Sequence, residues 1–289
     1  DASAAVNNGP LPLQTVILHR GYRTSAGAET VALDPHYVIS ATALTGQNGG
    51  RVLIEAVDGW GLLGLWRPEE PLSWQNRAIR WVIAALCARV GLRYADDASA
   101  ALGEAVNLFT LLPTQSAAEG VRALLDLAGA AARFDQEGTL VAFAWEDYAP
   151  AQALAIGANG EIRQGRYEAR LPLATGWRAA GHGVAASGDD CAASMALGLR
   201  LMGSAEDYRA VNALMAERLR AWRLARALMA ARRDQATIPL RPDAELWDLA
   251  ALTDPALGDG PHPRVVVALR ERYDPAAGRY ETVVGMGEG

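Results

Sequence analysis

The chain has 289 residues, of which 51% are hydrophobic and 21% are charged. This length suffices for two or three compact modules, and the composition excludes wholesale disorder. The formal net charge is −6, and all 27 basic residues are arginine. An acidic chain of this kind lacks the basic face that a nucleic-acid-binding protein needs, whereas arginine pairs bidentately with carboxylates and suits protein–protein contacts.

Membrane insertion and a disulfide framework are not expected either. No apolar run reaches the about 18 residues of a membrane span. The two cysteines, Cys87 and Cys191, lie far apart and outside any CxxC pattern, so they indicate neither a disulfide scaffold nor a zinc site. The sequence begins at Asp1 without a basic n-region, so no signal peptide is visible. The missing initiator Met suggests a processed or incomplete N-terminus.

Residues 1–68 are predicted to form a first β-barrel-like unit. Short segments rich in β-branched residues, at 15–18, 29–33, 37–40 and 51–57, are separated by turn residues. The sheet is expected to end at Asp58, Gly59 and Trp60.

Residues 69–175 are predicted to form a helical and α/β insertion. Apolar residues recur at helical spacing from Trp74 to Leu86, with Ser73 as N-cap and Gly91 after the last periodic residue. An extended piece at 109–113 precedes Ser116 and Glu119, which have the spacing of a capping box. The following helix and the strand after it complete a small α/β module.

Residues 176–289 are predicted to form a second β-barrel-like unit with an inserted long helix. A strand at 178–186 precedes an amphipathic helix from about Glu206 to Arg233, opened by Ser204. Strands follow at 237–240, 247–253, 264–269 and 279–284. The predicted fold class is therefore α+β: two small antiparallel β-barrel-like units with a small α/β insertion and amphipathic helices.

No catalytic, cofactor-binding or metal-binding residue is predicted. The four histidines show no metal-ligand spacing, and no nucleotide-binding or nucleophile-elbow motif is present. The nearest approach to a cluster is His182 with Asp189, Asp190 and Cys191, which we interpret as a strand residue followed by a polar turn. The acidic pairs at 69–70, 96–97 and 189–190 are interpreted as solvated turns, since adjacent loop residues normally point apart.

Eight tryptophans against three phenylalanines is an unusual balance. Most are expected to pack inside or between modules. Trp60, Trp66, Trp177 and Trp247 are the candidates for subunit-interface anchors, a role in which tryptophan is enriched. A carbohydrate-binding platform is the alternative interpretation of these rings.

Four segments in this order resemble the baseplate hub or tail-tip protein family of tailed bacteriophages, which has relatives in gene transfer agents and contractile injection systems. The strand and Asp-Gly-Trp turn at 52–63 resembles the end of the family's first barrel, and 109–145 resembles its small α/β insertion. The family usually has more strands before that turn, so the resemblance implies that the unit at 1–68 is abbreviated or truncated. Residues 247–253 resemble a late barrel strand, with Trp247 where the family usually has glycine, and 273–280 resemble the closing hairpin.

The resemblance implies a non-enzymatic structural protein of the virion tail tip, assembled in the host cytoplasm. It implies a homotrimer whose two barrels per subunit make a pseudo-sixfold ring, with a tail tube or distal tail ring protein on one side and a spike or fibre protein on the other. Cofactors are not expected. The alternatives are a tail-associated cell-wall hydrolase and a carbohydrate-binding adhesin.

Overall fold

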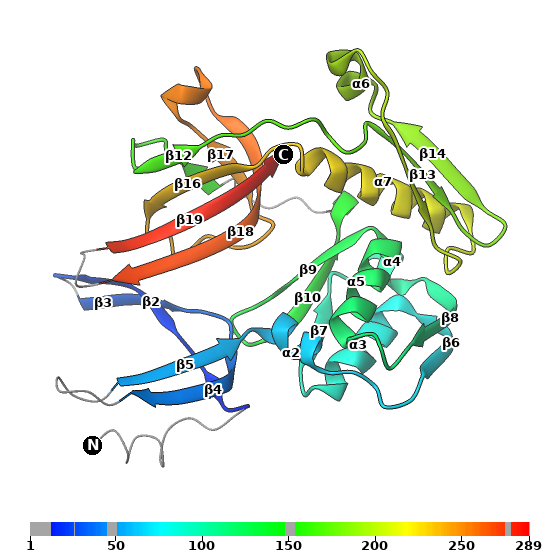
Figure 1. Ribbon diagram of the computed structural model, residues 1–289, viewed down its shortest axis with the longest axis horizontal. Helices are drawn as coiled ribbons and strands as arrows, with labels where there is room; N and C mark the ends of the chain where they lie inside the picture. Colours follow the sequence, from blue (N-terminus) through cyan, green and yellow to red (C-terminus); the bar gives the residue numbers. More distant parts are fainter. Residues whose placement is uncertain (1–12, 26, 45–50, 148–153, 275–278, 289) are drawn as a thin grey trace. The chain divides into compact units, whose positions relative to one another are not determined.

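A computed structural model describes residues 13–25, 27–44, 51–147, 154–274 and 279–288 (Figure 1). The chain divides into two compact units. Unit 1 comprises Asp1–Leu125 and Ala132–Ala142, and unit 2 comprises Asp126–Ala131 and Phe143–Gly289. The predicted three-part division, with boundaries after residues 68 and 175, stays a prediction.

The described strands of unit 1 form small separate sheets. One has the order β1-β4-β5, β2 pairs with β3, β6 pairs with β8, and another sheet has the order β7-β10-β9. The strands are β1 (Thr15–Val16), β2 (His19–Thr24), β3 (Gly27–Ala32), β4 (His36–Leu44), β5 (Arg51–Val57), β6 (Leu72–Ala78), β7 (Arg93–Asp96), β8 (Ala105–Leu111), β9 (Ala130–Phe134) and β10 (Thr139–Ala144).

Side-chain caps begin three of the helices of unit 1. The helices are α2 (Gly59–Leu65), α3 (Ile79–Arg89), α4 (Ala100–Gly103) and α5 (Ala117–Ala128). Asp58 caps α2 by accepting a hydrogen bond from the Gly61 amide at 2.8 Å, directly after β5 ends. Ahead of α5, the Ser116 amide donates to Glu119 at 2.7 Å and the Glu119 amide donates to the Ser116 hydroxyl at 3.3 Å, which confirms the predicted capping box.

The prediction of a helix that begins at Ser73 is wrong for the first turn and a half. Residues Leu72–Ala78 form strand β6, and α3 begins only at Ile79. In β6, Trp74 lies opposite Phe109 of β8, with ring centroids 5.9 Å apart. Apolar residues four apart lie on one face of a helix, and they also lie on one face of a strand. The contact between Trp74 and Phe109 across the two strands favours the strand here.

Unit 2 is built around a six-stranded sheet with the order β11-β17-β18-β19-β16-β12. Most of its pairs are antiparallel, and β11 pairs with β17 in parallel. Its strands are β11 (Leu154–Ile156), β12 (Gln164–Arg166), β16 (Asp234–Pro239), β17 (Leu249–Leu252), β18 (His262–Asp274) and β19 (Arg279–Glu288). Residues 275–278, within the resembled closing hairpin, lie outside the described residues, whereas Tyr273 and Tyr280 on either side pair in register.

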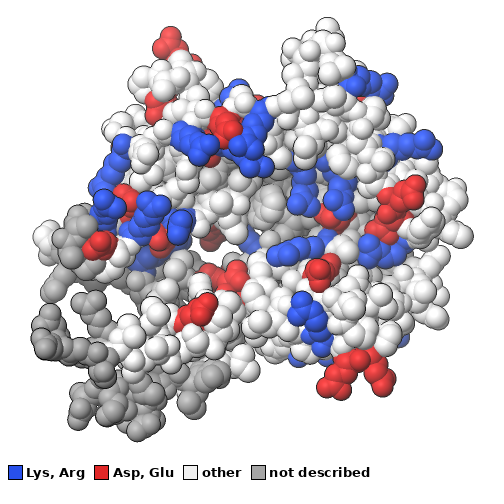
Figure 2. Space-filling view, in the orientation of Figure 1, with Lys and Arg blue, Asp and Glu red and all other residues white. Residues whose placement is uncertain are grey.

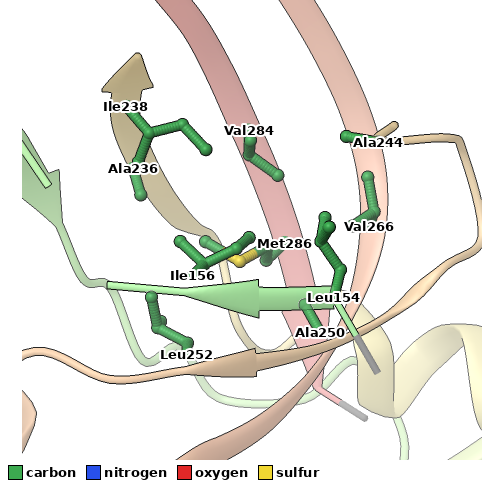
Figure 3. Packing of buried hydrophobic residues seen from close by; sticks show 10 residues of the cluster. All are labelled: Leu154, Ile156, Ala236, Ile238, Ala244, Ala250, Leu252, Val266, Val284 and Met286. Carbon is green, nitrogen blue, oxygen red and sulfur yellow. The ribbon is translucent and has the colours of Figure 1, made fainter. Parts of the chain in front are cut away.

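One face of this sheet curls around a hydrophobic core (Figure 3). Residues two apart in a strand point to the same face, so β11, β16, β17 and β19 each supply an i, i+2 pair. The core residues are Leu154, Ile156, Ala236, Ile238, Ala244, Ala250, Leu252, Val266, Val284 and Met286. At the end of β11, Gly157 has φ +84°, and a Cβ there would lie 2.0 Å from the Thr253 carbonyl oxygen, so only glycine fits.

A buried ion pair crosses this sheet. The Asp234 carboxylate accepts from Arg264 Nε at 2.7 Å and from the Glu168 amide at 3.1 Å. The side chains of Arg264 and Asp234 are 4% and 0% exposed. The pair therefore joins β16, β18 and the segment after β12.

The rest of unit 2 is a smaller sheet of order β14-β13-β15 and the long helix α7 (Ala213–Met229), which packs against β13 and β14 (Figure 1). The strands are β13 (Gly176–Ala180), β14 (Ala185–Asp189) and β15 (Met202–Glu206), and the short helix α6 (Cys191–Leu197) lies between β14 and β15. The predicted single strand at 178–186 is thus wrong, because the segment is a hairpin.

The predicted start of the long helix is also wrong. Ser204 lies in β15, which pairs in parallel with β13, and α7 begins at Ala213. The cap is Asn212, whose side chain accepts from the Met215 amide at 2.8 Å. Met215, Trp222 and Met229 are buried, which agrees with the amphipathic pattern of the predicted helix. The α+β class is confirmed. The six-stranded sheet includes β11 and β12, which precede residue 176, so the predicted second barrel-like unit at 176–289 stays a prediction.

We predict that Asp234→Ala lowers the free energy of unfolding by about 3–5 kcal/mol, because it leaves the Arg264 charge buried without its partner. Urea unfolding followed by tryptophan fluorescence measures the change. The control is Asp243→Ala, which removes a carboxylate 60% exposed and 2.8 Å from Arg241, and is expected to cost less than about 1 kcal/mol. Equal effects of the two variants would contradict a structural role for the buried pair.

A second prediction concerns Tyr167, whose hydroxyl donates to Asp254 at 2.6 Å. This hydrogen bond lowers the pKa of Asp254 below its ordinary 3.8. A lowered pKa means that the stabilisation is fully present above 3.8 and is lost as the pH falls through the lower folded value. Tyr167→Phe should therefore cost about 1 kcal/mol at neutral pH and less below pH 3.8, in chemical unfolding at a series of pH values. A difference independent of pH would contradict this.

Candidate interaction surfaces

Two of the four candidate interface tryptophans lie in unit 1. Trp60, in α2, packs edge-on against Phe134, with centroids 6.0 Å apart and planes at 85°. The Arg122 guanidinium lies over its ring at 5.1 Å. Trp66 follows α2 and is half-buried, and its carbonyl accepts from the Ala117 amide at 3.0 Å. Both residues therefore hold α2 in place, and their role in an interface stays a prediction.

The other two candidates lie in unit 2. Trp177 of β13 is half-buried over Gly203 of β15, where a Cβ would lie 2.4 Å from the ring. Trp247 belongs to a cluster with Trp145 and Trp222, whose centroids are 5.6 to 6.1 Å apart. The four candidates are thus dispersed over both units, and an interface role for Trp177 and Trp247 also stays a prediction.

Two of the three acidic pairs, at 96–97 and 189–190, have local structural partners. Asp190 caps α6 by accepting from the Ala193 amide at 2.8 Å, and Asp189 pairs with Arg200 at 3.3 Å. Asp96 accepts from the Ala98 amide and Asp97 from the Ser99 amide. These contacts match turn and capping roles.

The fold also separates His182 from the acidic pair that follows it. His182 lies at the turn of the β13–β14 hairpin, while Asp189 lies at the other end of β14. The four residue steps from Ala185 to Asp189 span roughly 13 Å. Among the described residues, no group of three or more His, Cys, Asp or Glu is placed to hold a metal ion. No helix in the described ranges is long and apolar enough to cross a membrane.

The ribbon formed by β4 and β5 carries an apolar surface that the sequence analysis missed. Its exposed apolar residues are Leu44, Val52, Leu53 and Ile54, and Leu53 is 62% exposed. Adjacent residues of a strand point to opposite faces, so Leu53 and Ile54 expose apolar side chains on both faces of β5 within the part of the chain that the structure describes. We call this set the ribbon surface. A continuous apolar run is typical of a strand covered on both sides, which is the signal that could have marked it.

A second apolar surface lies on α6 and the segment that follows it. No residue of α6 is buried, and Met195 is 82% exposed. Leu197, Leu199 and Met202 are also exposed, and we call these four residues the α6 surface. Clustered exposed apolar residues mark interaction sites more often than isolated ones do. The run from Cys191 to Met202 has almost no polar residues, which is the sequence signal for this surface.

Comparison with known proteins finds similarity at the level of structure. No family model and no curated protein matches the sequence. The tail protein from Neisseria meningitidis MC58 matches with a TM-score of 0.67 and 13% identity, covering 94% of this chain and 86% of that chain. The 43 kDa tail protein of prophage MuSo2 from Shewanella oneidensis matches with a TM-score of 0.65 and 12% identity, covering 95% and 88%.

A third similar structure is a type VI secretion component of E. coli, described as structurally similar to the T4 bacteriophage tail proteins gp27 and gp5. It has a TM-score of 0.58 and 10% identity, covering 96% of this chain and 65% of that chain. At these identities the likeness is one of fold. The chain therefore has the fold of phage tail proteins and of a related secretion component, and the resemblance to tail-tip proteins inferred from the sequence is confirmed for the fold.

The two thiols provide a test of the described geometry. Cys191 is exposed on α6, whereas Cys87 is fully buried in α3, and this burial raises its pKa to about 12. Because the thiolate is the reactive form, we expect a thiol reagent such as DTNB to modify one cysteine per native chain at neutral pH, and both in denaturant. Cys191→Ser should abolish the reaction of the native chain. Two rapidly reacting thiols in the native protein would contradict the burial of Cys87.

Proposed function

We propose that this chain is a structural protein of a phage tail tip or baseplate hub. The observation that carries the proposal is the likeness of fold to two tail proteins over 94% and 95% of the chain. The cap and ion-pair roles of the acidic pairs fit a structural protein rather than an enzyme. In this proposal the protein belongs to the virion, at the tail tip, after assembly in the host cytoplasm.

The proposed assembly is a homotrimeric ring in which each subunit contributes two barrel-like units. The curled six-stranded sheet of unit 2 supports this arrangement for one of the units. The ring would contact a tail tube or distal tail ring protein on one side and a spike or fibre protein on the other. The likeness to a secretion component described as similar to gp27 and gp5 supports partners of this kind.

The two exposed apolar surfaces are the proposed contacts between subunits. A ring is closed by heterologous contacts, in which one surface of a subunit meets a different surface of the next. The ribbon surface and the α6 surface supply two such different apolar surfaces. Burial of apolar area stabilises a contact by about 25 cal/mol per Å², so side chains as exposed as Leu53 and Met195 can contribute substantially.

We expect native mass spectrometry of the purified full chain to give a species of three times the 30.6 kDa chain mass. Leu53→Glu and Met195→Glu should each shift the distribution to monomer, because each places a charge in an apolar contact. The matched control is Leu108→Glu, which alters a side chain 49% exposed on β8, outside both surfaces, and should leave the trimer intact.

The possible failures of this experiment are distinguishable. Monomer alone at micromolar concentration would contradict the ring. A trimer unaffected by either variant would contradict the assignment of the two surfaces. Circular dichroism of each variant shows whether the loss of the trimer reflects unfolding instead.

A further inference from the structure

Unit 2 contains a groove whose rim is rich in arginine. The cavity has a volume of about 610 Å³, within the range that binds ligands. Arg166, Arg170, Arg226, Arg232 and Arg233 line it. In Figure 2, basic side chains flank acidic ones over the part of unit 2 that carries β12. Such a concentration of positive charge stands out in a chain whose net charge is −6.

The rim already binds carboxylates of the chain itself. Glu168 lies between two arginines, at 3.2 Å from Arg166 Nη2 and 2.5 Å from Arg170 Nε. Arg232 pairs with Glu288 at 3.2 Å, and Arg226 pairs with Asp126 at 3.1 Å. These contacts show that guanidinium groups of the rim are oriented to donate hydrogen bonds to a carboxylate.

The charges that line the groove do not balance. Five arginines and two carboxylates, Glu168 and Asp234, line it. Asp234 is already neutralised by Arg264 beneath the groove. Glu288 and Asp126 pair with Arg232 and Arg226 from outside the lining. The five arginines of the rim therefore face three carboxylates, those of Glu168, Glu288 and Asp126, and Arg233 is exposed at the rim. The groove carries a net positive charge that an anionic ligand can neutralise.

Apart from Gln235, the remaining lining is apolar. Met229, Trp247, Val267 and Met286 line the groove together with Gly285. A β-bulge between Val266 and Ala268 interrupts the β18–β19 register, and Val267 in the bulge is 44% exposed. Bulges re-aim side chains next to functional sites, and here the bulge turns an apolar residue outward into the groove.

We propose that this groove binds an acidic peptide segment of a partner protein. Carboxylates would pair with the rim arginines in the manner of Glu168, and an apolar side chain between them would contact Trp247 and Met229. A nucleic acid is disfavoured because the chain as a whole is acidic and the lining beneath the rim is apolar. The inference does not rest on the ring assembly, since every residue that it uses lies within one chain.

The test is fluorescence anisotropy of the full chain with labelled eight-residue probes. One probe has the sequence Gly-Glu-Glu-Leu-Glu-Glu-Ser-Gly, and its neutral twin has glutamine in place of each glutamate. We expect the acidic probe to bind about tenfold or more tightly than its twin, with affinity falling as salt is raised to about 0.5 M. An oligothymidylate of equal charge serves as the nucleic-acid probe and should bind more weakly than the acidic peptide.

Arg170→Glu and Arg233→Glu should each weaken binding of the acidic probe by about tenfold, because they reverse charges at the rim. The matched control is Arg178→Glu, an exposed arginine of β13 outside the groove, which should leave the affinity unchanged. Any one of four outcomes would overturn the proposal. They are no binding at millimolar protein, equal binding of the two peptides, tighter binding of the oligonucleotide than of the acidic peptide, and an equal loss of affinity in the control variant. Native mass spectrometry of the rim variants separates this outcome from a failure of the trimer.

Discussion

The buried pair of Arg264 and Asp234 is the constraint on which unit 2 depends. The two residues come from β18 and β16, which lie on either side of β19. Strands two places apart in a sheet are separated by about 9.6 Å, so only a side chain as long as arginine reaches across the intervening strand. The Glu168 amide donates to the same carboxylate. A buried charge pair is costly to break because the remaining charge has no access to water, so this pair ties β16, β18 and the segment after β12 to one another.

The same pair determines the electrostatics of the groove above it. By neutralising Asp234, Arg264 removes one of the two carboxylates that line the groove from the charge balance of the rim. The hydrogen bond from the Glu168 amide to Asp234 fixes the backbone at Glu168, whose side chain orients Arg166 and Arg170. Glu168 thus connects the buried ion pair, through its amide, with the exposed arginines of the rim, through its carboxylate.

The ribbon surface and the α6 surface differ from the groove, because their exposed residues are apolar and not charged. The four residues of the ribbon surface are exposed, and no residue of α6 is buried. Their side chains leave much apolar area exposed to water in the described chain, and such exposed area does not stabilise an isolated subunit. In a ring assembly these residues would be covered, and the apolar contact between subunits would stabilise the subunits and the ring together.

The sequence by itself determined the α+β class, the capping box at Ser116 and Glu119, the buried face of α7 and the resemblance to tail-tip proteins, because these depend on local hydrogen bonds, residue spacing and order along the chain. Only the tertiary structure decided that Leu72–Ala78 is a strand and that α7 begins at Ala213, since the pairing partners β8 and β13 lie elsewhere in the sequence. It alone also brought the rim arginines together from β12, α7 and the segments next to them. The spacing of residues along one segment indicates which of its faces is apolar. Long-range packing determines which element covers that face and which charged residues from distant parts of the sequence come together.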